Sequence, residues 1–331
     1  MSLKQVAPVG ALRVGVVGAG VMGSNHARVL AGLPGITLVG IVDPLPAHRT
    51  RAEEHVACRT FETLEQLLAA GVDAVTVAAP THLHHDISLE LISRGIHVMV
   101  EKPIASSVEE GRDIVAAAHK AGVTLMVGHV ERFNPAVVAV KQALKGEDIL
   151  SIAITRVGPF PPRMSNVGVV IDLAVHDIDL IRWFTESDIV DVQPQLASAV
   201  AEREDIALLQ FRTESGVLAH INTNWLTPFK ARSVTVATRG KYVMGDLLTR
   251  QVTECFGFKP DGSYSMRHLP VGHDEPLRAE LIAFTDAVRT GKPPAVSGEE
   301  AVASLEIAIR CLGTPAKPAN KAGKGLRQVT G

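Results

Sequence analysis

The sequence predicts two regions: an α/β Rossmann domain with a parallel, doubly wound sheet, then an α+β domain with a mostly antiparallel open sheet. Three observations support this. Short apolar strands alternate with helical patterns over residues 12–127, and three glycines spaced G-x-G-x-x-G follow the first strand. After Gly128 the pattern changes to alternating, half-buried strands. We therefore divide the chain into residues 1–128 and residues 129–331.

The first region alternates strand and helix in regular order. Its expected strands are continuously apolar, which is typical of a parallel sheet covered on both faces. The expected strands are residues 12–17, 36–42, 74–78, 96–100 and 124–127, and the expected helices are residues 21–31, 47–56, 64–70, 87–94 and 108–120.

The glycines lie between the first strand and the first helix. Gly18 is expected to make the tight turn, Gly20 to let the backbone approach a pyrophosphate, and Gly23 to let helix and strand pack closely. The free N–H groups at the helix start, at Val21 and Met22, then offer an anion site. This turn predicts that residues 1–128 bind a dinucleotide.

Asp43 ends the second expected strand about 20 residues after Gly23, where a carboxylate hydrogen-bonds the adenosine ribose. A 2′-phosphate at this place would meet a negative charge, so the sequence favours NAD over NADP. Arg49 and Arg51 follow and would weaken that exclusion.

Charge and cysteine content restrict the partners. With 33 basic and 35 acidic residues the formal charge is −2, which gives no reason to expect nucleic acid or an anionic membrane as a partner. The start of the chain lacks a signal-peptide pattern, and no apolar run is long enough for a membrane helix. The cysteines (Cys58, Cys255 and Cys311) have neither zinc spacing nor the look of a disulfide framework, so we expect reduced thiols in a cytoplasmic protein.

The second region mixes hairpins with a few helices. Turn sequences at 214–216 and 239–240 separate strands that alternate polar and apolar residues. The expected strands are residues 149–157, 205–212, 217–225, 233–238 and 241–244, and the expected helices are residues 135–145, 170–184, 276–290 and 299–312.

Two short motifs follow strands of the first region. Ala79-Pro80-Thr81 and His84 come directly after residues 74–78, at the sheet edge where ligands bind in open α/β folds. The adjacent His82 and His85 raise the question of a metal, but no carboxylate or cysteine stands at a useful spacing, so we expect cofactor contacts and no metal.

Glu101-Lys102-Pro103 follows the strand 96–100 in the same way. A lysine at this edge is placed to reach into a site beside a nicotinamide. There its charge would orient a substrate hydroxyl and lower that hydroxyl's pKa. An ordinary solvated Glu-Lys pair is the alternative.

Two further motifs lie in the second region. Arg132 and Asn134 stand at the junction, where they would bridge cofactor and second domain, or simply mark a helix start capped by Asn134. Asp172 and His176 are spaced i,i+4, which places both on one helical face. Histidine is the natural general base for an alcohol, and a carboxylate would hold it, although a lone helical histidine is also often structural.

Together, these motifs resemble the Gfo/Idh/MocA family of sugar oxidoreductases, over nearly the whole chain. The resemblance implies hydride transfer between a sugar carbon and nicotinamide, with His176 as general acid/base, Lys102 polarising the hydroxyl and Asp172 positioning the substrate. It further implies cofactor contacts from the glycine turn, residues 79–84, Glu101, Lys102 and Arg132. In such proteins the second sheet often forms homodimers or homotetramers.

Within the family, residues 128–135 and 156–179 are most similar to enzymes that oxidise the 3-hydroxyl of UDP-N-acetylglucosamine. Arg156 and Arg163 flank a proline-stiffened loop, and arginines suit a diphosphate, although both would also fit an ordinary surface turn. Two alternatives stay open: a free sugar or inositol-type polyol dehydrogenase, and a non-catalytic NAD-sensing regulator.

Overall fold

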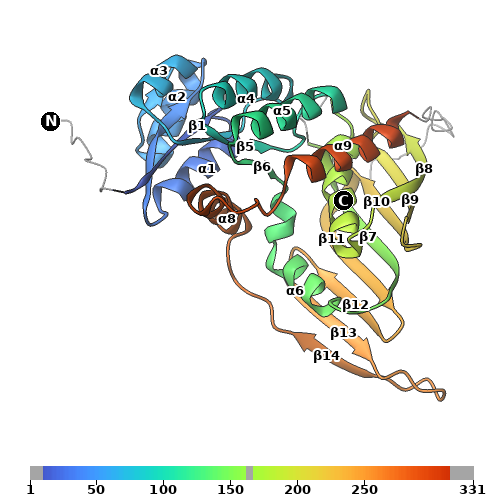
Figure 1. Ribbon diagram of the computed structural model, residues 1–331. Helices are drawn as coiled ribbons and strands as arrows, with labels where there is room; N and C mark the ends of the chain where they lie inside the picture. Colours follow the sequence, from blue (N-terminus) through green and yellow to red (C-terminus); the bar gives the residue numbers. More distant parts are fainter. Residues whose placement is uncertain (1–9, 162–166, 314–331) are drawn as a thin grey trace, which may run out of the picture.

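A computed structural model describes residues 10–161 and 167–313 of this chain. The described residues form two sheets that lie side by side and are joined by helices (Figure 1). The first sheet has six strands in the order β3-β2-β1-β4-β5-β6, and every neighbouring pair is parallel. The predicted Rossmann fold is confirmed.

The elements of the first sheet follow the predicted sequence order with small differences at their ends. The strands are β1 (Leu12–Val17), β2 (Ile36–Val42), β3 (Thr60–Phe61), β4 (Ala74–Val77), β5 (His97–Glu101) and β6 (Leu125–Gly128). The helices are α1 (Val21–Ala31), α2 (Pro46–Val56), α3 (Leu64–Ala70), α4 (His84–Ser93) and α5 (Val108–Ala121). The two-residue strand β3 at the sheet edge was not among the predicted strands, because a strand this short has no periodic pattern to detect.

The second sheet has eight strands in the order β14-β13-β12-β11-β7-β10-β9-β8. All pairs are antiparallel except β7 with β10, which run parallel. The strands are β7 (Ile149–Pro159), β8 (Ile189–Ala197), β9 (Ile206–Thr213), β10 (Leu218–Asn224), β11 (Leu226–Thr238), β12 (Lys241–Asp246), β13 (Gln251–Phe256) and β14 (Ser265–Leu269). The mostly antiparallel second sheet is confirmed; β8, β13 and β14 were not among the predicted strands.

One face of this sheet is covered by helices. Inward-facing residues such as Ile152, Ile154 and Val234 are fully buried and share a core with α6 and α7. The covering elements are a short 3₁₀ turn η2 (Val130–Phe133), α6 (Pro135–Ala143), a π-helical turn η3 (Val170–Ala174) and α7 (Val175–Thr185).

The last two helices return to the first sheet. Buried residues of α8 (Pro276–Thr290), including Leu281 and Phe284, belong to the core of the Rossmann sheet, as does Val302 at the start of α9 (Gly298–Leu312). Farther along α9, Ile307 and Cys311 belong to the core of the second sheet. The packing therefore does not follow a simple division at residue 128, because the C-terminal helices bind the two cores together.

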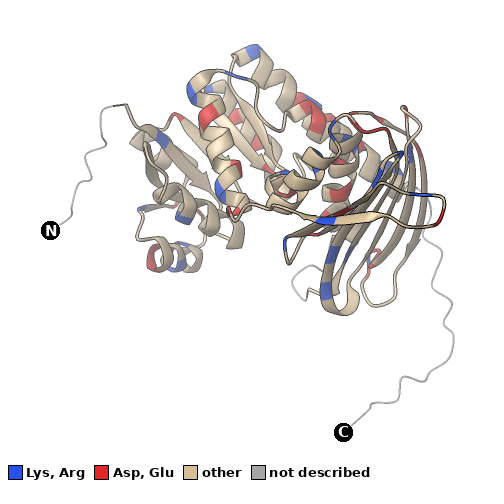
Figure 2. Ribbon diagram, turned by 90° about the horizontal axis from the view of Figure 1, so that it is seen from below, with Lys and Arg blue, Asp and Glu red and all other residues tan. Residues whose placement is uncertain are grey.

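Acidic and basic side chains are interspersed along the described elements, without a large region of one sign (Figure 2). Among the helices of residues 10–161 and 167–313, none combines the length and apolar character needed to cross a membrane.

Candidate active site

The glycine turn has the geometry expected of a phosphate-binding loop. Gly18 has φ +98°, and a Cβ there would lie 2.6 Å from the carbonyl oxygen of Ala78. At Gly23 a Cβ would lie 1.7 Å from the carbonyl oxygen of Gly18, so α1 can approach β1 this closely only with glycine. Around Gly20, by contrast, no atom lies within 4 Å of the Cβ position. That open space suits the backbone approach of a pyrophosphate.

The start of α1 is free to bind an anion. Its N-cap, Gly20, offers no side-chain cap, and the first turn carries no acidic residue. Val21 and Met22, apolar residues at the same end, are 67% and 37% exposed. Free N–H groups at the positive end of the helix dipole, beside uncovered apolar surface, fit the pyrophosphate of a dinucleotide.

Asp43 ties the end of β2 to this turn. Its Oδ2 accepts a hydrogen bond from the Ala19 amide at 2.8 Å, and its Oδ1 accepts one from the Leu45 amide at 2.9 Å. His48 Nδ1 lies 3.1 Å from Oδ2. Two carboxylate oxygens offer about four acceptor positions, so one position is left for a ribose hydroxyl. Arg49 donates to the carbonyl oxygens of Asp43 and the next residue, beside this carboxylate.

His84 joins the two motifs at the sheet edge. Its ring is 1% exposed, with Nε2 2.8 Å from the carbonyl oxygen of Ala79 and Nδ1 2.9 Å from that of Pro103. Burial lowers the pKa of His84, and a neutral ring has a single N–H to donate. The ring therefore donates to only one of these two carbonyl oxygens, while its two nitrogens face the loops at Ala79-Pro80-Thr81 and Glu101-Lys102-Pro103.

Glu101 lies beneath its turn. It is 8% exposed, and its Oε1 lies 2.8 Å from Nε2 of His26 in α1. This contact connects the end of β5 to the helix that follows the glycine turn. The carboxylate of Glu101 thus helps to fix the position of α1 relative to β5.

Lys102 reaches across to the second region. Its Nζ donates to the carbonyl oxygen of Asp172 at 2.7 Å and lies 3.4 Å from Oδ1 of the same residue. Both side chains keep some exposure, 16% for Lys102 and 22% for Asp172. Two of the three predicted catalytic residues, 70 positions apart in sequence, thus lie in contact.

The element that carries Asp172 is not the regular helix predicted for residues 170–184. Residues 170–174 form a π-helical turn, and the α-helix begins at Val175, so Asp172 and His176 lie on either side of the junction. Glu204 fixes the start of the turn: its Oε1 accepts from the Val170 amide at 3.2 Å, and its carbonyl oxygen accepts from the Val169 amide at 2.9 Å. π-turns of this kind are frequent at functional sites.

His176 is held as a neutral base. Burial lowers its pKa well below 6.5, and the positive charges of Lys102, Arg156 and Arg232 lower it further. Its Nδ1 is buried and has no hydrogen-bond partner among the described residues. The ring meets His129 edge to face at 6.2 Å between centroids. An uncharged imidazole beside a lysine can accept a proton from a hydroxyl at neutral pH.

Arg132, predicted to contact the cofactor, lies instead in a buried ion pair. Its Nε and Nη2 each donate to Asp179 at 2.7 Å, and Nη1 donates to Glu300 at 2.8 Å. The residue is 5% exposed. Since all three guanidinium nitrogens are engaged, Arg132 connects η2 to α7 and α9 and does not face a cofactor.

Arg156 also differs from its predicted role. It is 3% exposed; Nε and Nη2 donate to Asp177 at 2.7–3.0 Å, and Nη1 donates to Glu131 at 2.8 Å. A guanidinium saturated by two buried carboxylates does not fit a substrate diphosphate. Arg163, its predicted partner in that role, lies outside the described residues.

Three residues near the site were not predicted: His129, Glu131 and Arg232. Glu131 accepts from Arg156 and, at 3.0 Å, from Nη1 of Arg232. His129 and Glu131 stand within the Gly128–Pro135 motif, which signals the junction but not their partners. Arg232 comes from a strand with no motif of its own.

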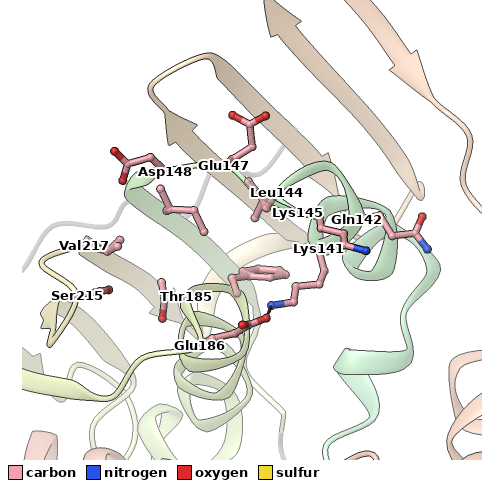
Figure 3. A pocket seen from close by; sticks show the side chains of 13 residues that line it. Lys141, Gln142, Leu144, Lys145, Glu147, Asp148, Thr185, Glu186, Ser215 and Val217 are labelled. Carbon is pink, nitrogen blue, oxygen red and sulfur yellow. Dashed lines mark hydrogen bonds and ion pairs between the residues drawn. The ribbon is translucent and has the colours of Figure 1, made fainter.

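A pocket of about 650 Å³ lies away from these residues, at the far end of α7 (Figure 3). Lys141 and Glu186 form an ion pair across it at 2.6 Å. Thr185, on its wall, is nine residues beyond His176, a distance of about 13 Å along a helix. The pocket is therefore separate from the candidate site.

Comparison with known proteins agrees with this geometry. Residues 12–129 match the family model for the oxidoreductase family with an NAD-binding Rossmann fold, and residues 152–243 match the GFO/IDH/MocA C-terminal domain. Inositol 2-dehydrogenase 4 of Saccharopolyspora erythraea is 32% identical, over 85% of this chain and 86% of the relative. The chain belongs to the Gfo/Idh/MocA family.

Other relatives refine the comparison. UDP-N-acetylglucosamine 3-dehydrogenase of Acidithiobacillus ferrooxidans is 27% identical, over 85% of this chain and 90% of the relative. Its crystal structure has a TM-score of 0.85 at 26% identity, covering 91% of this chain and 96% of that one. GenD2 from gentamicin A biosynthesis, in complex with NAD, has a TM-score of 0.78 at 25% identity, covering 92% and 95%. This member of the family is an NAD(P)-dependent dehydrogenase that acts on hydroxyl groups of sugars or polyols.

Proposed function

We propose that this dehydrogenase uses NAD to oxidise a hydroxyl of a nucleotide sugar, the 3-hydroxyl of UDP-N-acetylglucosamine. The observation that carries the proposal is the contact between Lys102 and Asp172, which brings the end of β5 to the helix that bears a neutral His176. Similarity to the Acidithiobacillus ferrooxidans enzyme supports the choice of substrate.

Each of these residues takes one role in the proposed reaction. His176 accepts the proton of the reacting hydroxyl, because burial keeps its imidazole neutral and its free nitrogen able to accept one. Lys102 donates a hydrogen bond to the same hydroxyl and favours its deprotonation. Asp172 fixes Lys102 through its carbonyl oxygen and its carboxylate. Bound NAD supplies the hydride acceptor. In the opposite direction, protonated His176 returns the proton.

Asp43 supports NAD over NADP. Its carboxylate is 6% exposed and already accepts two backbone amides, so it is fixed where the 2′-phosphate of NADP would lie. The kcat/KM for NAD and for NADP, measured with one substrate, tests this choice. A preference for NADP would contradict it.

A polyol substrate is the second candidate, favoured by the 32% identity to an inositol 2-dehydrogenase. NADH formation, measured with UDP-N-acetylglucosamine, myo-inositol and glucose, separates the two. NADH with UDP-N-acetylglucosamine is the expected result. If NADH forms with myo-inositol alone, the proposed substrate is a polyol and not a nucleotide sugar. If no NADH forms with any sugar or polyol, the result favours an NAD-sensing regulator.

The roles of the two catalytic residues have a direct test. In Lys102→Ala and His176→Ala, turnover should fall about 10²- to 10⁴-fold while NAD still binds. His85→Ala, whose partly buried ring lies between Asp86 of α4 and Asp113 of α5, is the matched control and should keep wild-type turnover. Wild-type turnover in both Lys102→Ala and His176→Ala would contradict the catalytic roles proposed for these residues.

We further propose a homodimer or homotetramer formed through the uncovered face of the second sheet. Leu208 and Tyr242, on this face, are 50% and 39% exposed. Light scattering after size-exclusion chromatography tests this, and a monomer would contradict it. Free Cys58, Cys255 and Cys311 support a reducing compartment, the cytoplasm.

A further inference from the structure

Arg232 is a second arginine beside the active site, and it differs from its neighbour Arg156 in what it can still bind. The two residues are directly paired between β11 and β7, so both point to the helix-covered face of the sheet. Arg156 is saturated by Asp177 and Glu131, whereas the side chain of Arg232 is 34% exposed.

Most hydrogen-bond donors of Arg232 are not used by the described residues. The one hydrogen bond that its side chain makes with them runs from Nη1 to Oε1 of Glu131, an oxygen that Arg156 already shares. A guanidinium has five N–H donors in a planar fork that matches phosphate or carboxylate oxygens. Arg232 therefore presents a fixed, partly exposed fork.

The guanidinium of Arg232 lies near the catalytic residues. The charge of Arg232 lowers the pKa of His176, and the charge of Asp172 raises the pKa of Arg232, so these groups lie within electrostatic range of one another. Burial and the positive charge of Arg156 nevertheless give Arg232 a lowered pKa overall, which an added anion would reverse.

Lys230 extends this positive surface along β11. It is exposed, and its Cγ lies 3.5 Å from the Cβ position that Gly158 lacks. Gly158 is two residues beyond Arg156 on β7, so it lies on the same face of the sheet. Lys230 and Arg232 thus stand in a row, with Arg232 nearer His176.

We infer that Arg232 and Lys230 form the subsite for the phosphate groups of the substrate, with Arg232 binding the phosphate attached to the sugar and Lys230 the next phosphate outward. The inference rests on the proposed nucleotide-sugar function and assigns its specificity to these two side chains. The subsite makes a sugar phosphate, or the diphosphate of a nucleotide sugar, a better substrate than the free sugar.

The test compares Arg232→Gln, Lys230→Gln and a matched control, Arg239→Gln, on UDP-N-acetylglucosamine, N-acetylglucosamine 1-phosphate and N-acetylglucosamine. Arg239 follows the same strand and pairs with Asp148 at the surface. Arg232→Gln should raise KM about 10- to 100-fold for both phosphorylated substrates, because a charge-assisted hydrogen bond to the phosphate is lost. Its kcat should stay within a few-fold of the wild-type value. Lys230→Gln should raise KM for the diphosphate substrate alone. Arg232→Lys should recover part of the loss.

A binding measurement separates this inference from the proposed function. The dissociation constant of UDP, measured by calorimetry with saturating NAD, should rise about tenfold or more in Arg232→Gln and stay unchanged in Arg239→Gln. Wild-type turnover of myo-inositol alone would overturn the proposed function. Turnover of UDP-N-acetylglucosamine with equal KM in wild type and Arg232→Gln, or equal UDP binding, would overturn the subsite and leave the function intact.

Discussion

Two groups of buried ionisable side chains lie close to the active site, and they differ in whether each group has a partner of opposite charge. Between η2, β7 and α7, the guanidinium groups of Arg132 and Arg156 meet the carboxylates of Asp177, Asp179 and Glu131 at 2.7–3.0 Å. Each of these charges has a direct partner of opposite sign. The group connects η2, β7 and α7 beside the second sheet.

Beneath the Glu101-Lys102-Pro103 turn the buried charges are not balanced. Glu280 of α8 is fully buried, and neither of its carboxyl oxygens has a hydrogen-bond partner among the described residues. The nearby Glu101 accepts from His26 at 2.8 Å and adds its own negative charge. Burial raises the pKa of both Asp177 and Glu280, but only Asp177 has an arginine whose charge lowers its pKa again, so the comparison shows how pairing opposes burial.

The largest effect is expected from breaking the paired group. Arg156→Met leaves Asp177 and Glu131 buried, with Arg232 as the one remaining cation that Glu131 contacts among the described residues. Loss of one partner of a buried pair costs about 3–5 kcal/mol, so the free energy of unfolding in urea should fall by about that amount.

Two variants make this measurement decisive. Arg239→Met, which breaks the exposed pair with Asp148, should cost at most about 1 kcal/mol. The double variant Arg156→Met/Asp177→Leu should recover part of the loss, because no unpaired aspartate then remains. A loss in Arg156→Met no greater than that in Arg239→Met would show that the buried pairs do not stabilise the fold.

A smaller effect, dependent on pH, is expected from the unbalanced group. Burial and the charge of Glu101 raise the pKa of Glu280 well above 4.5. In the unfolded chain Glu280 loses its proton near pH 4.5. In the folded chain it loses the proton only at a higher pH. The unfolded state then binds fewer protons, so stability falls as pH rises above 4.5, by up to about 1.4 kcal/mol per pH unit, until the folded-state pKa is passed.

Glu280→Gln removes this proton linkage and keeps the size of the side chain. Its unfolding free energy should match that of the wild type near pH 5 and exceed it by about 1–3 kcal/mol at pH 8. Asp286→Asn, an exposed carboxylate on the same helix, is the control and should follow the wild-type curve. Parallel curves for wild type and Glu280→Gln from pH 5 to 8 would show that Glu280 is ionised in the folded protein.

Features that depend on local geometry or on continuous burial could be predicted from the sequence. The glycine turn could be predicted because its function depends on local backbone geometry: Gly18 has a positive φ, and a Cβ at Gly23 would meet the carbonyl oxygen of Gly18. The strands of the first sheet could be predicted because burial on both faces makes them continuously apolar. By contrast, β14 has almost no buried residue, so it lacks that pattern.

Ion-pair partners could not be predicted in this way. The sequence shows that Arg132 and Arg156 are positively charged, but their partners Asp179 and Asp177 lie 47 and 21 positions away and become neighbours only when α7 packs on the sheet. Arg156 and Arg232 look alike in sequence, and only burial separates the saturated arginine from the partly exposed one. Lys102 and Asp172 could each be predicted as site residues because each belongs to a motif of the family, but the contact between them comes from the structure alone.

The smallest effect on stability is expected from breaking an exposed charge pair. Arg28 of α1 pairs with Glu275, just before α8, and the side chains are 51% and 42% exposed. Water and salt screen such a pair, so Arg28→Met should change the free energy of unfolding by less than about 1 kcal/mol, and 0.5 M salt should remove most of the difference. The change caused by Arg156→Met should persist in the same salt, because no solvent reaches that pair. Equal salt sensitivity of the two variants would mean that water enters the buried group, and the contrast between exposed and buried pairs in this protein would be lost.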